Sequence, residues 1–75
     1  MKEKRRLFTI FSPAPPPEGK PLRRFWFDED LENPLDEFKL NELIDIELNR
    51  CAKHHHKMKG QLFAIETFKM DIVKK

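Results

Sequence analysis

Apolar and polar positions alternate in two short stretches near the N-terminus. The run Leu7–Phe11 is rich in residue types that favour strands. In Arg23–Phe27, the rings of Phe25 and Phe27 would lie on one face of a strand and the ring of Trp26 on the other, because successive side chains of a strand point to opposite faces. The pattern therefore predicts two strands in this part of the chain.

A proline-rich segment separates the two stretches. Residues 12–21 contain five prolines. Proline lacks the backbone N–H that a helix or a sheet ladder needs, so neither a helix nor a central strand is expected there. The segment is predicted to be an extended polyproline II connector or an exposed loop, within a single domain that covers residues 1–75.

The middle of the chain follows helical spacing. At 100° per residue, six positions fall within about 40° of one direction, namely Leu40, Ile44, Leu48, Cys51, His55 and Met58. Asn33 as N-cap, Pro34 as first helical residue and Gly60 as terminator would delimit this helix. The shorter run Ile44–Leu48 also alternates as a strand would. The six positions at helical spacing, which we call the seam, extend over more residues and favour a helix with Leu40, Ile44, Leu48 and Met58 buried. Ile46 would project from its polar face.

Residues 61–73 admit two interpretations. As a strand, they would place Leu62, Ala64, Phe68, Met70 and Ile72 on one face, interrupted by Glu66. As a helix, they would carry apolar residues all round. The strand is favoured because Phe, Ile, Thr and Val prefer strands. The predicted order is β-β-α-β, an α+β domain with one long helix packed on a small, mostly antiparallel sheet.

Size and cysteine content bound the class of protein. A chain of 75 residues allows one domain with a small core, and a single cysteine allows no internal disulfide. The apolar run Leu7–Phe11 is shorter than the roughly 7–15 residues of a signal-peptide core, and no stretch reaches the roughly 18–20 apolar residues of a membrane span. We therefore expect a cytoplasmic protein without membrane contact.

Charge is segregated along the chain despite a net charge of only +2. Residues 1–24 carry seven basic and two acidic side chains, residues 25–48 one basic and nine acidic, and residues 49–75 seven basic and two acidic. The acidic block either pairs with the basic flanks, which is the favoured alternative, or presents a negative surface to a basic partner. The partner-binding residues in the second case would be Asp28, Glu29, Asp30, Glu32, Asp36 and Glu37.

The stretch Arg23–Phe27 also mixes cations with aromatic rings, as binders of single-stranded nucleic acid do. A nucleic-acid surface that combined it with the other basic clusters would use Arg5, Arg6, Arg23, Arg24, Trp26, Lys53 and Lys57. The competing interpretation is that Phe25 and Phe27 belong to the core and the arginines merely solvate a strand end. We favour the second, because so short a chain needs its aromatic residues for packing.

Catalytic and metal-binding patterns are weak. Consecutive helical residues point about 100° apart, so His54, His55 and His56 cannot converge on one ion, and the i,i+4 pair Cys51 and His55 supplies only two of the four ligands of a structural zinc site. The two glycines, Gly19 and Gly60, cannot form a phosphate-binding loop. A thiol on the buried seam is normally inert. We expect no enzyme, no metal and no cofactor.

These observations favour a non-enzymatic accessory, regulatory or inhibitory protein. Its partner would be a larger protein or a protein–nucleic acid complex, approached with the help of charge. Direct nucleic-acid binding is the alternative. The sequence predicts no oligomeric state.

The expectation that the histidines hold no structural metal is testable. Dialysis against a strong chelator should leave the melting temperature unchanged, because no ligand-linked stabilisation would be removed. A fall of many degrees that zinc reverses would show a metal site.

Overall fold

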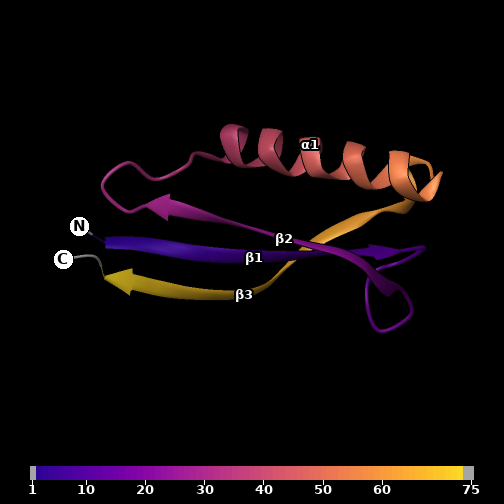
Figure 1. The fold of residues 1–75 in the computed structure, drawn as a ribbon, viewed down its shortest axis with the longest axis horizontal. Helices are drawn as coiled ribbons and strands as arrows, with labels where there is room; N and C mark the ends of the chain where they lie inside the picture. The colour runs from indigo at the N-terminus through magenta and orange to yellow at the C-terminus, as the bar shows by residue number, and fades with distance from the viewer. Residues whose placement is uncertain (1, 74–75) are drawn as a thin grey trace.

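The structure, a computed structural model, describes residues 2–73 as one three-stranded sheet with a helix against it (Figure 1). The elements are β1 (Lys2–Ser12), β2 (Lys20–Asp30), α1 (Glu37–His55), the 3-10 turn η1 (Lys59–Gln61) and β3 (Phe63–Val73). The strand order is β2-β1-β3, and both pairings are antiparallel. The predicted order and fold class are confirmed, and residues 63–73 form a strand.

The proline-rich segment is a hairpin loop, the second of the two predicted alternatives, but it is shorter than residues 12–21. Ser12 ends β1 and Lys20 begins β2, so only residues 13–19 lie outside the strands. Gly19 is buried, and its N–H donates to the Pro15 carbonyl at 3.1 Å. A Cβ at Gly19 would lie 1.5 Å from the Ala14 carbonyl oxygen, so this close approach requires glycine. The loop thereby joins the two strands that form the first hairpin.

The helix begins and ends at residues other than those predicted. Its N-cap is Asp36, whose carboxylate accepts the Lys39 N–H at 2.7 Å, and not Asn33. The preceding residue, Leu35, donates its N–H to Glu29 in β2 and is thereby held outside the helix. The C-cap is His56, in the left-handed conformation with φ 51°, and not Gly60. No helix among the described residues has the length and apolar character needed to cross a membrane.

Because α1 ends earlier than predicted, the C-terminal residues of its predicted buried face are not buried. Leu40, Ile44 and Leu48 face the core, as the helical pattern predicted, but they are half-buried rather than buried. Met58 was predicted to be buried, but it lies beyond the helix and is 74% exposed. His55, in the last turn, is exposed as well. The helical period thus located the buried face correctly but not its extent.

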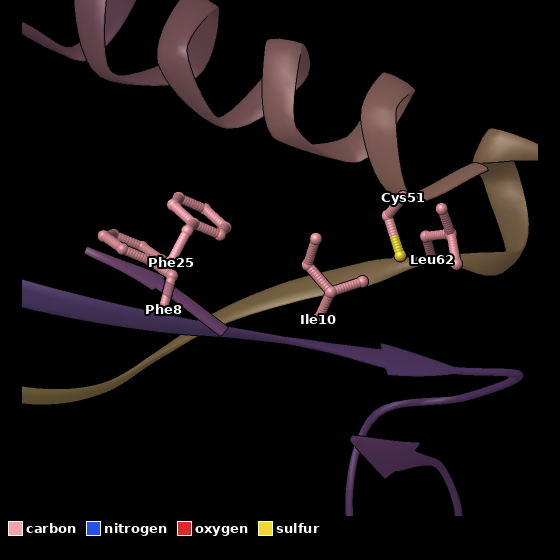
Figure 2. Close-up of a cluster of buried hydrophobic side chains, with 5 residues drawn as sticks. All are labelled: Phe8, Ile10, Phe25, Cys51 and Leu62. Carbon is pink, nitrogen blue, oxygen red and sulfur yellow. The ribbon is translucent and has the colours of Figure 1, made fainter. Parts of the chain in front are cut away.

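The core lies between α1 and one face of the sheet. Figure 2 shows its five buried apolar side chains, which are Phe8, Ile10, Phe25, Cys51 and Leu62. The ring of Phe8 stacks on that of Phe25, with centroids 5.5 Å apart. Ile10 and Cys51 are fully enclosed. Phe25 therefore points into the core and Trp26 away from it, as the alternation in β2 predicted.

A β-bulge in β3 divides the residues that were predicted to share one face. Leu7 of β1 pairs with Phe68, whereas the next residue, Phe8, pairs with Glu66, so Thr67 is an additional residue without an opposite partner. Before the bulge, Leu62 and Ala64 pack on the core. After it, Phe68 and Met70 lie on the other face of the sheet, opposite Leu7 and Arg5 of β1, and are exposed. One extra residue inverts the alternation, and the sequence pattern did not reveal it.

Truncating two isoleucines tests this assignment of the core. Ile10→Ala removes a fully enclosed side chain and should lower the free energy of unfolding by about 2–5 kcal/mol. The matched change Ile46→Ala, on the exposed side of α1, should alter it by less than about 0.5 kcal/mol. Urea unfolding followed by circular dichroism measures both. Equal effects would contradict the placement of the core.

Candidate interaction surface

The face of the sheet opposite α1 carries a row of apolar side chains across all three strands. Leu7 in the central strand is paired with Trp26 of β2 on one side and with Phe68 of β3 on the other. Trp26 is 64% exposed and Phe68 is 55% exposed. Met70, two residues further along β3, is 43% exposed. We call this surface, formed by Leu7, Trp26, Phe68, Met70 and the residues beside them, the open face.

Two cations border this row. Arg5 and Arg24 line, together with Leu7, Trp26 and Phe68, a hollow of about 570 Å³. Arg5 donates to both carboxylate oxygens of Asp28, at 2.9 and 3.2 Å, and this hydrogen bonding raises the pKa of Arg5. The side chain of Arg24, in contrast, makes no hydrogen bond or ion pair with any described residue. The open face is therefore mostly apolar, with a single unpaired cation.

On the helix-covered face, Arg6 joins the three strands. Its guanidinium donates to Glu66 of β3 at 2.6 and 3.1 Å and lies 3.6 Å from the Glu29 carboxylate of β2. It also lies over the rings of Phe8 and Phe27, 5.5 and 5.7 Å from their centroids. The hydrogen bond from Arg6 lowers the pKa of Glu66, because it favours the charged carboxylate. This network holds the sheet together rather than exposing charge.

The residues of the predicted acidic surface are distributed over several parts of the fold. Asp28 pairs with Arg5, and Glu29 is buried, where it accepts the Leu35 N–H at 2.7 Å. Asp30 accepts the Glu32 N–H, and Asp36 caps α1. The side chains of Glu32 and Glu37 are exposed. Four of the six carboxylates thus bind groups of their own chain; partner binding by this set stays a prediction.

The residues of the predicted nucleic-acid surface separate into groups. Arg5, Arg24 and Trp26 meet on the open face. Arg6 is engaged on the opposite face, and Arg23 and Lys53 line another hollow with two further basic residues of α1. Lys57 follows the helix and lines none of these hollows. The residues that sequence reasoning missed are Leu7, Phe68 and Met70, because the bulge hides the change of face in β3.

The Cys51 and histidine region shows no assembled site. Cys51 is buried, and desolvation raises the pKa of its thiol, which opposes formation of a thiolate. His54, His55 and His56 are exposed at the end of α1. Within residues 2–73, no three His, Cys, Asp or Glu side chains are grouped so that they could hold a metal ion.

Comparison of the chain with protein-family models, with curated proteins and with solved structures finds no match.

The ion pair between Arg6 and Glu66 makes stability depend on pH. The folded-state pKa of Glu66 is lowered, so its contribution is fully present above the ordinary glutamate pKa and is lost as the pH falls through the folded-state value. Glu66→Gln should be less stable than the parent at neutral pH and should lose less stability on acidification. Thermal melts from about pH 7 to about pH 3 measure this. Glu42→Gln, on the exposed helix surface, is the control, and parallel curves for parent and Glu66→Gln would refute the coupling.

Proposed function

We propose that this protein is a non-enzymatic accessory or regulatory protein that binds a larger protein through the open face. The observation that carries the proposal is the apolar row of exposed Trp26, half-buried Leu7 and exposed Phe68 on a sheet face that no described element covers. Contiguous exposed apolar surface rimmed by polar residues is characteristic of interaction sites. Trp in particular is enriched among the residues that contribute most to protein–protein binding.

The balance of charges favours a protein over a nucleic acid as the partner. Binding to phosphates draws its affinity from several neutralised contacts. On the open face, Arg5 is already paired with Asp28. Of the two arginines there, only Arg24 has a guanidinium group without a partner among the described residues. A mainly apolar surface with one free arginine suits a protein patch that is apolar and carries a carboxylate at its edge.

The distribution of charge along β2 supports a role for charge in orienting the partner. On the open face, the first half of β2 carries the unpaired Arg24, and its last part carries Asp28, which pairs with Arg5. Arg23 and Glu29 lie on the helix-covered face, where they pair with Glu47 and Arg6. Trp26 lies between these two ends. A partner with the opposite gradient would be drawn in one orientation, which raises association rates and selects against other partners.

A specific observation favours the alternative of single-stranded nucleic acid. Two exposed rings, Trp26 and Phe68, flank Leu7 beside the unpaired Arg24, and such rings can stack with bases. On this alternative, oligonucleotides would bind to the same open face. Because Trp26 is the single tryptophan of the chain, its fluorescence reports on this face directly.

Two separate alanine substitutions, each at an exposed aromatic residue, test the proposal. Trp26→Ala should weaken capture of a specific protein partner by about tenfold or more, since truncation of a central interface Trp costs about 2 kcal/mol or more. Phe38→Ala, which removes a ring that is 78% exposed on α1, should leave capture unchanged. Quantitative mass spectrometry of proteins retained on the immobilised variants, at low and high salt, is the measurement.

A titration with oligonucleotides separates the two candidate partners. We expect Trp26 fluorescence to report only weak binding, in the nonspecific range of roughly 10⁻⁴–10⁻⁶ M or weaker near physiological salt. Tight binding that Arg24→Ala or Trp26→Ala abolishes would overturn the protein proposal and establish the nucleic-acid alternative. Loss of capture in both Trp26→Ala and Phe38→Ala would argue against the open face as the binding surface.

A further inference from the structure

The sheet has two outer edges, and they differ in protection. The outer edge of β2 contains Pro21, is crowded with charged residues and has α1 beside it. Neither outer edge is paired with a strand among residues 2–73. The outer edge of β3 differs from that of β2 because it contains no proline, and its bulge at Thr67 lies before the segment 68–73. A free edge presents unpaired backbone N–H and C=O groups to any chain that can pair with them, so natural proteins usually block such edges.

The charges on the edge of β3 select one register of self-pairing. When identical strands pair antiparallel about a twofold axis, the residue on the axis faces its own copy, and residues equally far before and after it face each other. With Met70 on the axis, Lys69 of each copy lies opposite Asp71 of the other. Opposite charges in directly facing positions stabilise a strand pair. This register therefore forms two favourable charge pairs at once.

The neighbouring registers are unfavourable. Moving the axis by one residue places Lys69 opposite Lys69, or Asp71 opposite Asp71, and facing like charges are destabilising. Within the described chain, Lys69 and Asp71 are both exposed, and neither makes an ion pair. Inside the sheet, Lys69 lies opposite another cation, Arg6, whereas Asp71 lies opposite Lys4 but forms no ion pair with it. The two charges are thus available, and their only complementary register is the one centred on Met70.

The same register also covers apolar side chains. Phe68 of one copy would lie opposite Ile72 of the other, and Met70 would lie against its own copy, all on the open face. Phe68 and Met70 are among the large apolar residues that the isolated chain leaves exposed. Charge pairs on one face of the strand and apolar pairs on the other therefore favour the same alignment.

We infer that two copies of this chain pair through β3, antiparallel and centred on Met70, and form a continuous six-stranded sheet with the order β2-β1-β3-β3-β1-β2. This self-association uses the outer edge of β3 and goes beyond the proposed binding of a partner protein to the open face. Trp26 and Arg24 lie on β2, separated from the β3 edge by the central strand, so they remain exposed in the dimer.

Charge reversal at the two positions tests the register. Lys69→Asp sets two carboxylates against each other at both facing positions, and Asp71→Lys sets two ammonium groups against each other. Each single variant should therefore weaken dimerisation by about tenfold or more. The double variant Lys69→Asp/Asp71→Lys restores opposite charges and should dimerise as the parent does. Sedimentation equilibrium over a range of protein concentrations measures the dissociation constants.

Mixing the two single variants gives the most specific result. The pairing of a Lys69→Asp chain with an Asp71→Lys chain sets an acid opposite a base at both positions, so the mixture should form heterodimers although neither variant dimerises well alone. Lys53→Asp, the same charge change on the exposed surface of α1, should leave dimerisation unchanged. Circular dichroism melts establish that each variant is folded.

Three outcomes would overturn the inference. They are a parent that stays monomeric at all concentrations, single variants that dimerise as the parent does, and a double variant or mixture that fails to recover. The Trp26→Ala variant distinguishes this inference from the proposed function, because it should lose the partner protein and still dimerise.

Discussion

One helix packed on one face of a two-faced sheet is the constraint on which the rest of this structure depends. The core is the layer between α1 and the sheet, with Ile10 and Cys51 fully enclosed (Figure 2). A sheet of three 11-residue strands has a second face of similar extent, and the described chain supplies no element to cover it. The apolar residues there, Trp26 and Phe68 among them, remain exposed because nothing in the fold reaches them. In a short chain, a surface of this kind is available for a partner.

Charge is used differently on the two faces. On the covered face, Arg6 binds Glu66 and Glu29, so its positive charge is neutralised between the strands that it connects. Glu47 of α1 similarly lies between Arg23 and Arg50. On the open face, Arg24 is left without a partner among the described residues. The segregation of charge along the chain therefore serves mainly to assemble the fold, and a small remainder is left to orient binding.

Strand β3 combines two tasks because of its bulge. The start of the strand closes the core through Ala64, together with Leu62 just before it. Its second half presents Phe68 and Met70 on the open face, with Lys69 and Asp71 along a free edge. If β3 instead continued as a regular strand through Thr67, without the bulge, the two halves would place their apolar side chains on the same face. The bulge thus provides both the third member of the apolar row and the apolar partners of the proposed strand pairing.

Local patterns in the sequence determined the elements, their order and most of the core. Phe25 and Phe27 alternate with Trp26, and Leu40, Ile44 and Leu48 recur at helical spacing, because side-chain direction follows from strand and helix geometry alone. The N-cap is Asp36 and not Asn33 because the Leu35 N–H donates to Glu29 in β2, a contact that exists only in the folded chain. Tertiary contacts also separate the residues of the predicted acidic surface, because Asp28 and Glu29 form ion pairs with arginines of the neighbouring strand β1. The row of Trp26, Leu7 and Phe68 likewise depends on strand order and on the bulge in β3. Pairing between strands far apart in the sequence sets these contacts, so the tertiary structure alone decided where the exposed face lies.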